Sequence, residues 1–282
     1  MTELLPPAFP PAPGPAAPWA PVPPPRPARP YSRREQKQRH RRRAAVGLVG
    51  VIGELMITLG ALLALYVVWE LVWTDVEAHQ EAAAVVELVE HRTDWIEPNP
   101  VSPYAPHRDP ATEAPPVDEA PLATPSFGDS WALLHVPRWG LDYNVPIVEG
   151  TDRVQILNKG LIGHYLGTEG PGRIGNFATS AHRTTYGKPY NLAAELEDGD
   201  SLIVETAEYY FVYRVYGREI VYPDAVRVIW PVPNEEGAVP TRRLMTLTTC
   251  HPMFSARQRY VVWGELAYWT AKADGPLEEL AG

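Results

Sequence analysis

Residues 44–69 form a run of 26 almost wholly apolar residues, and this run constrains the chain more than any other feature of its sequence. About 20 such residues span the hydrocarbon core of a bilayer as a helix. The segment directly before the run, residues 32–43, carries 7 Lys/Arg, and basic residues beside a span stay in the cytoplasm. The sequence therefore predicts a membrane-spanning segment at 44–73, with the N-terminus in the cytoplasm and everything after the span outside the cell.

Glu54 is the single charged residue of this apolar run. A carboxylate at the centre of a bilayer costs about 2.5–3.5 kcal/mol on insertion scales. Because the run is longer than a span requires, shifting it outward places Glu54 near the inner interface. The alternative is a cleaved signal peptide, since AAA at 82–84 fits a small-residue cleavage site, but signal-peptide apolar regions have only about 7–15 residues. The length favours an uncleaved anchor.

Two proline-rich segments flank this anchor. The first, residues 1–31, holds 13 of the 32 prolines, a composition that cannot bury enough apolar surface to offset the entropy of ordering. We expect residues 1–43 to be a disordered, proline-rich and basic cytoplasmic tail, with a ligand for a polyproline-binding partner as the alternative. After the span, a helix-forming stretch at 74–91 precedes the second segment at 96–126, so residues 74–128 predict a membrane-proximal helix followed by a stiff stalk.

Charge and cysteine content exclude several classes of protein. Residues 1–43 carry 9 Lys/Arg and 2 Asp/Glu, a net of +7, which leaves 16 of the 25 Lys/Arg and 32 of the 34 Asp/Glu, a net of -16, in the rest of the chain. That balance argues against a nucleic-acid-binding protein. The single Cys excludes an intrachain disulfide framework, a CxxC zinc site and a cysteine-ligated iron–sulfur cluster.

Residues 129–272 are the part of the chain with the composition of a folded domain, and residues 273–282 are left as a C-terminal tail. Strand-like runs separated by turn residues recur through the domain, at 131–137, 141–150, 176–182, 201–221, 226–232, 243–250 and 259–269. The stretches with helical character, 153–159 and 191–197, are short. Many short strands in about 140 residues predict an all-β barrel or sandwich with short helices.

Cys250 is the first candidate for chemistry. It ends the alternating run 243–250, and Arg259 opens the next run after eight intervening residues, 251–258. A loop of that length can join two neighbouring antiparallel strands, which brings Cys250 and Arg259 close together. A guanidinium beside a thiol stabilises the thiolate or a developing oxyanion. The alternative is that Cys250 is a small buried apolar residue.

A cysteine nucleophile needs an acid–base partner, which is almost always His. Four of the eight His residues lie in the folded domain: His135, His164, His182 and His251. His135 lies within a strand-like run, and His251 points to the opposite face of the strand from its neighbour Cys250. His182 stands where a run ends and a turn begins, a typical place for a catalytic residue. His164 has a similar loop-like context and stays an alternative.

Taken together, these segments carry a family resemblance. TLTTC at 246–250 with Arg259 resembles the active-site signature of sortases, and NFATSAHR at 176–183 resembles the segment that holds their catalytic His. The segments GHYLGTEGPGRIGN, HRTTYGKPYN and CHP are similar to the corresponding segments of class E housekeeping sortases. The resemblance covers residues 129–268 and implies an eight-stranded β-barrel, here behind one transmembrane helix and a stalk. It implies a transpeptidase that cuts a C-terminal sorting motif, LAxTG-like or LPxTG-like, between Thr and Gly.

The resemblance also implies roles for individual residues. Cys250 would be the nucleophile that holds a thioacyl intermediate, and His182 the acid–base. Arg259 would donate hydrogen bonds to the substrate or oxyanion, with Arg257 as the alternative, and Thr249 would support the oxyanion site. The implied partners are secreted proteins with a sorting signal, a cell-wall precursor amine and the membrane, with no nucleic acid.

No cofactor is expected. The acidic run at 195–200 could bind calcium, but it lacks a DxDxDG ligand ladder and a solvated turn fits it better. Two rival functions remain open at this point: an extracellular binding or scaffold barrel with an inert thiol, and a sortase-fold protease that mainly hydrolyses its substrates. The second rival shares every candidate residue with the transpeptidase and differs only in the access of an amine.

Overall fold

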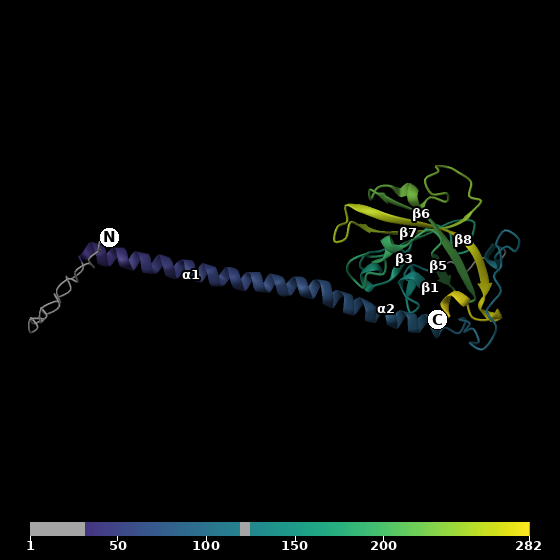
Figure 1. Cartoon of the computed structure of the whole chain (residues 1–282), viewed down its shortest axis with the longest axis horizontal. Helices are drawn as coiled ribbons and strands as arrows, with labels where there is room; N and C mark the ends of the chain where they lie inside the picture. Colours follow the sequence, from purple (N-terminus) through teal and green to yellow (C-terminus); the bar gives the residue numbers. More distant parts are fainter. Residues whose placement is uncertain (1–31, 119–124, 282) are drawn as a thin grey trace, which may run out of the picture. The chain divides into compact units, whose positions relative to one another are not determined.

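The computed structural model describes residues 32–118 and 125–281 (Figure 1). The chain divides after Ala61 into two compact units, of which the second, Leu62–Gly282, holds the folded domain. The prediction for the proline-rich residues 1–31 lies outside the described residues, and so does that for residues 119–124 of the stalk.

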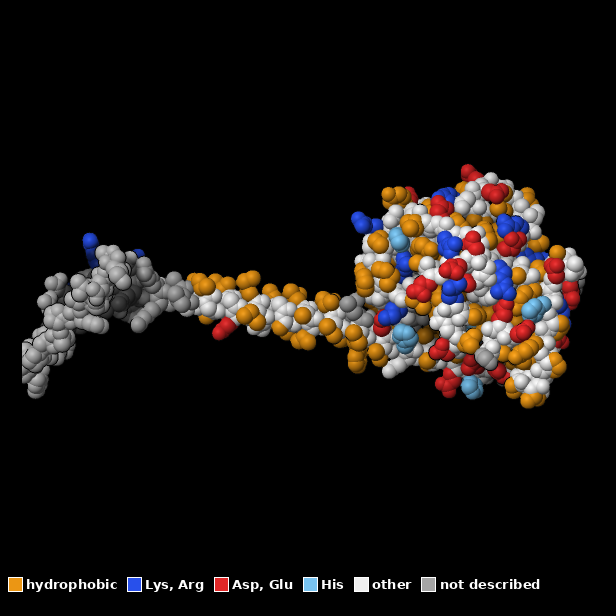
Figure 2. Space-filling view, viewed as in Figure 1, with side chains coloured by type: hydrophobic (Ala, Val, Ile, Leu, Met, Phe, Trp, Pro, Cys, Tyr) orange, Lys and Arg blue, Asp and Glu red, His pale blue; other side chains and the backbone are white. Residues whose placement is uncertain are grey.

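Residues 44–68 of the predicted span 44–73 lie within one long helix, α1 (Arg33–Val68). Residues Gly47–Val68 are the one helical stretch of the described chain that is long and apolar enough to cross a membrane. Its apolar side chains are exposed, and Figure 2 shows them in orange along the helix. A π-helical turn, η1 (Trp69–Trp73), leads directly into helix α2 (Thr74–Glu90). The predicted membrane-proximal helix therefore forms as a continuation of the apolar one.

Eight strands close into a barrel, which confirms the predicted fold class. The neighbours around the barrel run β1-β2-β3-β4-β7-β8-β6-β5, with β2 and β3 parallel, β4 and β7 parallel, and all other pairs antiparallel. The strands are β1 (Ser130–His135), β2 (Asn144–Glu149), β3 (Ile162–His164), β4 (Gly175–Ser180), β5 (Ser201–Glu205), β6 (Tyr209–Val221), β7 (Arg243–His251) and β8 (Gln258–Ala271).

The alternation along each strand sends every second side chain into the barrel. On β7, for example, Met245 and Leu247 point inward and are fully buried with Phe177, Phe211 and Val262. Interior filling of this kind leaves no channel through a barrel of eight strands. The chemistry must therefore lie at an end of the barrel, where the strands pass into loops.

Three strand predictions differ from the structure. Residues 201–221, predicted as one run, form the two antiparallel strands β5 and β6, with residues 206–208 between them. Residues 226–232, predicted as a strand, instead begin with the 3-10 helix η6 (Val226–Ile229). Pro231 and Pro233 both follow this helix, and they lack the amide protons that a strand would need. Trp263 holds η6 on the barrel by donating its indole N–H to the Val228 carbonyl at 3.2 Å. Strand β3 was not predicted, because its three residues are all buried and show no alternation.

The segment after α2 differs from the expected stalk. Its described part, residues 91–118, packs against the barrel: Trp95, Ala105 and Val117 are buried, and Arg108 pairs in a β-bridge with Trp269. The C-terminal residues also pack there, through the buried Leu277. Scattered apolar residues in a proline-rich segment carry little periodic signal, but each can occupy a site on the barrel surface. The described residues of this segment thus form an outer layer of the domain.

Candidate active site

A cavity of about 450 Å³ opens where the end of β7, the start of β8 and the segment after β4 meet. All four residues proposed from the sequence for the site line it. The full lining comprises Arg153, Leu157, Ser180, Ala181, His182, Thr184, Thr185, Thr249, Cys250, Phe254, Ser255, Ala256 and Arg259.

The strand pairing places Cys250 and Arg259 side by side. In the antiparallel ladder of β7 and β8, Cys250 lies directly opposite Arg259. In the parallel ladder of β4 and β7, Ser180 lies opposite Thr248, so the chain leaves β4 toward His182 beside Cys250. Cys250 is a free cysteine with a half-buried side chain. The ladder of three strands thus brings residues about 70 positions apart to one cavity.

His182 is held in a defined orientation and charge state. Its Nε2 lies 2.8 Å from Oδ1 of Asn158, and because a carbonyl oxygen accepts, Nε2 carries the proton and Nδ1 has the free lone pair. Burial, with a smaller contribution from the positive charge of Arg153, lowers the pKa of His182 to about 4. The imidazole is therefore neutral at pH 7 and able to accept a proton.

Arg259 lies at the rim of the cavity. Its Nη1 donates to the carbonyls of Ala256 and Gln258, at 2.9 and 3.0 Å, which fixes the guanidinium against the loop before β8. Arg257, the alternative, is an exposed residue of that loop, where its backbone N–H contacts Ser255. Of the two arginines, Arg259 is the one that lines the cavity.

Thr249 lines the cavity but uses its hydroxyl elsewhere. The side chain is buried, and its Oγ1 donates to the Ala181 carbonyl at 2.8 Å. This bond ties the end of β7 to the residue before His182. The geometry favours a role in holding the two segments together over direct contact of the Thr249 hydroxyl with an oxyanion.

Arg183 is a residue that the sequence analysis missed. It is buried, and its Nη1 lies 3.3 Å from the Cys250 carbonyl, to which it donates, and 3.0 Å from His251 Nδ1. Its guanidinium also stacks over the Tyr260 ring at 5.3 Å. An Arg beside a His at a turn usually indicates an exposed residue, and the sequence carries no signal for this burial. Asn158 was missed for the same reason, since its contact spans 24 residues.

The other histidines of the domain have different surroundings. His164 is buried within the barrel, with Nδ1 2.7 Å from the Glu149 carboxylate and its ring against Trp131. His251 contacts Arg183, as its position on the opposite face of β7 from Cys250 suggests. His182 is the one of the four that lines the cavity with Cys250.

The acidic run at 195–200 is engaged in ion pairs. Arg138 contacts Glu197 and Asp200, and Arg218 contacts Asp198. Within residues 32–118 and 125–281, no group of three or more His, Cys, Asp or Glu side chains is arranged to hold a metal ion.

Comparison with known proteins agrees with this geometry. A family model described as a sortase domain matches residues 134–267. Sortase SrtE2 of Streptomyces coelicolor is 33% identical over 244 residues, which cover 80% of this chain and 86% of that protein. The chain belongs to the sortase family. Sortase SrtE1 of the same organism is 35% identical over 233 residues, covering 80% of this chain, which spans only 59% of that relative's length.

Solved structures support the same assignment for this sortase. SrtA from Actinomyces oris is 38% identical, with a TM-score of 0.57, over 63% of this chain and 97% of that one. Sortase E1 from S. coelicolor, solved with a tripeptide in the active site, is 37% identical, with a TM-score of 0.51, over 56% of this chain and 100% of that one. The class E resemblance seen in the sequence is thus confirmed at the level of relatives and fold.

Proposed function

We propose that this sortase is a membrane-anchored transpeptidase that cleaves a sorting motif between Thr and Gly and joins the Thr carbonyl to a cell-wall amine. The observation that carries the proposal is the single cavity lined by Cys250, His182 and Arg259 in a chain of this family. The three residues come from β7, from the segment after β4 and from β8, and each supplies a different part of acyl transfer chemistry.

Acylation begins when the Cys250 Sγ attacks the Thr carbonyl carbon. The thiol proton passes to Nδ1 of neutral His182, and negative charge develops on the carbonyl oxygen. Arg259 donates to that oxygen or to the substrate backbone, where its fixed charge counts most. The C–N bond to Gly then breaks, and His182 gives the proton to the leaving amine, which regenerates the neutral imidazole.

The second half transfers the acyl group to the acceptor. The incoming amine attacks the thioester carbon, neutral His182 takes a proton from that amine, and the C–S bond breaks. The Cys250 sulfur leaves as a thiolate and recovers the proton from His182. The low pKa of His182 suits this step, because the imidazole arrives unprotonated at neutral pH.

The location follows from the apolar helix Gly47–Val68 and the basic cluster before it. A positive flank on the N-terminal side favours a cytoplasmic N-terminus and an extracellular barrel. The substrates would then be secreted proteins that carry an LAxTG-like or LPxTG-like signal, and the acceptor a cell-wall precursor amine outside the membrane.

One experiment tests the proposal and separates it from its rivals. The full chain in detergent is incubated with an LAxTG peptide or an LPxTG peptide, each with an amine acceptor, and the products are identified by mass spectrometry. A product joined at Thr, absent with Cys250→Ala, supports transpeptidation. Free Thr acid without transfer supports the hydrolase. If neither peptide reacts and thiol reagents leave Cys250 unmodified, the binding-domain function is favoured instead.

A further inference from the structure

Helix α2 contacts two loops that also form the cavity at Cys250. The first loop, residues 150–161, supplies Leu157 to the cavity and Asn158 to the ring of His182. The second loop, residues 181–192, carries His182 itself. Since α2 touches both loops from outside the cavity, its position can determine where the imidazole lies.

The contact between α2 and the loops is very close. A Cβ atom on Gly160 would lie 2.8 Å from the Ala78 carbonyl oxygen of α2, and a Cβ on Gly187 would lie 3.2 Å from the Gly160 Cα. The first distance excludes a side chain at Gly160 unless the helix or the loop shifts, and the second leaves only a tight fit at Gly187, whose Cβ would also lie 3.4 Å from the Ala78 Cβ. The three small residues therefore allow α2 to lie directly on the backbone of both loops.

Asp75 adds a directional polar contact at the same place. Its Oδ1 accepts from the Gly187 backbone N–H at 3.1 Å, and its Oδ2 accepts from Lys188 Nζ at 2.8 Å. The Asp75 side chain is 12% exposed and the Lys188 side chain 43%, so water screens the carboxylate less than it screens the ammonium group. A carboxylate bound to a backbone N–H and to an ammonium is a strong combination.

The segment that Asp75 holds is strained. Tyr186, Gly187 and Lys188 are three consecutive residues with positive φ, at 54°, 72° and 42°. For residues other than Gly this left-handed region is sparsely populated, and such conformations persist only where the surroundings enforce them. The Asp75 contacts fall on the second and third of these residues. The first, Tyr186, lies with its ring centroid 5.3 Å from that of His182.

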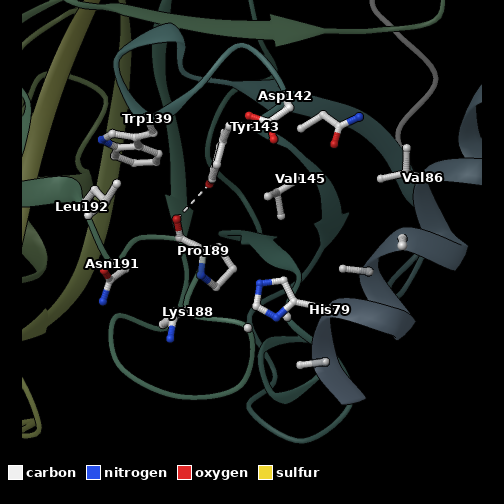
Figure 3. Close-up of a pocket in the computed structure, with 16 residues that line it drawn as sticks. His79, Val86, Trp139, Asp142, Tyr143, Val145, Lys188, Pro189, Asn191 and Leu192 are labelled. Atoms are coloured by element: carbon white, nitrogen blue, oxygen red, sulfur yellow. Dashed lines mark hydrogen bonds between the residues drawn. The ribbon is translucent and has the colours of Figure 1, made fainter. Parts of the chain in front are cut away.

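Few other contacts support the loop from this side. A cavity of about 550 Å³ separates α2 from the following part of the loop, with Ala82 and Val86 on the helix side and Val145 and Leu192 opposite (Figure 3). On the wall opposite α2, the Tyr143 hydroxyl donates to the Pro189 carbonyl at 2.9 Å (Figure 3). Because the cavity replaces close packing here, the contacts at 187–189 are those by which α2 supports the loop. They add to the loop's own hydrogen bonds, such as that from the Tyr190 N–H to the His182 carbonyl at 3.0 Å.

We infer that Asp75 is a positioning residue: by holding Tyr186–Lys188 in the left-handed conformation, α2 fixes the position of His182 in the cavity that it shares with Cys250. The inference rests on the acid–base role proposed for His182. It also gives the segment next to the membrane span a part in catalysis, since α2 follows the apolar helix through a single turn, Trp69–Trp73.

The test compares Asp75→Ala and Asp75→Asn in the full chain in detergent. Glu77→Gln is the matched control, because it removes one negative charge from an exposed position of the same helix. We expect Asp75→Ala to lower kcat of the peptide transfer at least tenfold, with KM changed less than threefold. Asp75→Asn, which keeps an oxygen acceptor, should recover part of the loss, and Glu77→Gln should match the wild type.

Two further readouts separate positioning from a loss of stability. The acid limb of the kcat profile should move to higher pH in Asp75→Ala, because a loosened loop exposes His182 and its low pKa rises toward 6.5. Hydrogen exchange of residues 183–190 should become faster, while exchange of β7 stays unchanged. Wild-type kcat in Asp75→Ala, or an equal loss in Glu77→Gln, would overturn the inference.

The outcome also stays distinguishable from failure of the proposed function. If the wild type transfers no peptide, the proposed function fails, and hydrogen exchange alone then decides whether Asp75 holds the loop: unchanged exchange in Asp75→Ala overturns the inference. If the wild type is active and His182→Ala is not, but Asp75→Ala behaves as the wild type, the inference fails and the proposed function stands.

Discussion

Two histidines of this sortase, His182 in the cavity and His135 in the barrel wall, differ in the partner that each receives. In the cavity, His182 faces a neutral amide oxygen of Asn158, and its pKa is lowered. In the wall of the barrel, His135 lies 2.7 Å from the carboxylate of Glu205, which also binds the fully buried Lys272 at 2.7 Å.

The barrel-wall cluster of His135, Glu205 and Lys272 favours the ionised form of the Glu205 carboxylate. Burial alone raises the pKa of Glu205, but the hydrogen bond and charge of His135 and the charge of Lys272 outweigh it, so the pKa falls below its usual value. Lys272 also lies 4.0 Å from the Trp95 ring centroid. The barrel wall thus pairs its histidine with a carboxylate, whereas the cavity gives His182 a neutral partner and leaves its imidazole unprotonated at pH 7.

The largest expected effect is a loss of activity when residues of the cavity are replaced. Cys250→Ala should abolish transfer, and His182→Ala should lower kcat by about 10²–10⁴, the usual contribution of a general acid–base. Both variants should keep the wild-type melting temperature, because neither side chain belongs to the barrel core. His164→Gln is the comparison variant, read as activity per folded molecule; a loss equal to that of His182→Ala would reopen the choice between them.

The next largest effect is a loss of stability when the barrel-wall cluster is disrupted. Lys272→Met leaves the Glu205 carboxylate without its buried cation, a change that costs about 3–5 kcal/mol of unfolding free energy. Chemical denaturation measures this loss, and activity per folded molecule should not change. Arg242→Met is the control, because it removes an exposed pair with Glu265 and should cost less than about 1 kcal/mol. Equal losses in both variants would contradict the prediction.

Arg259→Lys tests whether Arg259 is the arginine that donates to the oxyanion or the substrate. Lysine keeps the charge but lacks the planar fork, and loss of one oxyanion donor lowers kcat by about 10²–10³. Steady-state kinetics with the peptide substrate measure the effect. Arg257→Lys, in the same loop, should retain wild-type kinetics. A larger loss in Arg257→Lys would transfer the role to that residue.

The smallest expected effect concerns the charge beside His182. Arg153 helps to lower the pKa of His182, so Arg153→Gln should raise that pKa from about 4, while burial still keeps it below 6.5. Activity that needs neutral His182 is lost as pH falls through this pKa, so the acid limb of kcat/KM should move to higher pH. Arg138→Gln, whose charge pairs with Asp200, should leave the limb in place. If the acid limb of kcat/KM keeps its wild-type position in Arg153→Gln, a group other than His182 controls that limb.

Much of the fold could be predicted from local patterns. The apolar length of 44–69 indicates a span, and the alternation in 243–250 and 259–269 indicates two strands whose loop brings Cys250 to Arg259. These signals depend on neighbours within about ten residues. Strand β3 was not predicted because it is short and uniformly buried. The strand prediction for 226–232 was wrong because β-branched residues also fit a 3-10 helix, here one that Trp263 binds.

The sequence by itself determined the long apolar helix, the all-β domain and the residue types at the cavity, because each follows from local composition, periodicity or motif spacing. Only the tertiary structure decided three other features: which histidine lines the cavity with Cys250, that the buried Arg183 donates to the Cys250 carbonyl, and that Asp75 binds Lys188, 113 residues away. Contacts between residues so far apart in the sequence form only when the barrel closes and helix α2 packs against it. No local sequence pattern predicts which distant segments will then meet.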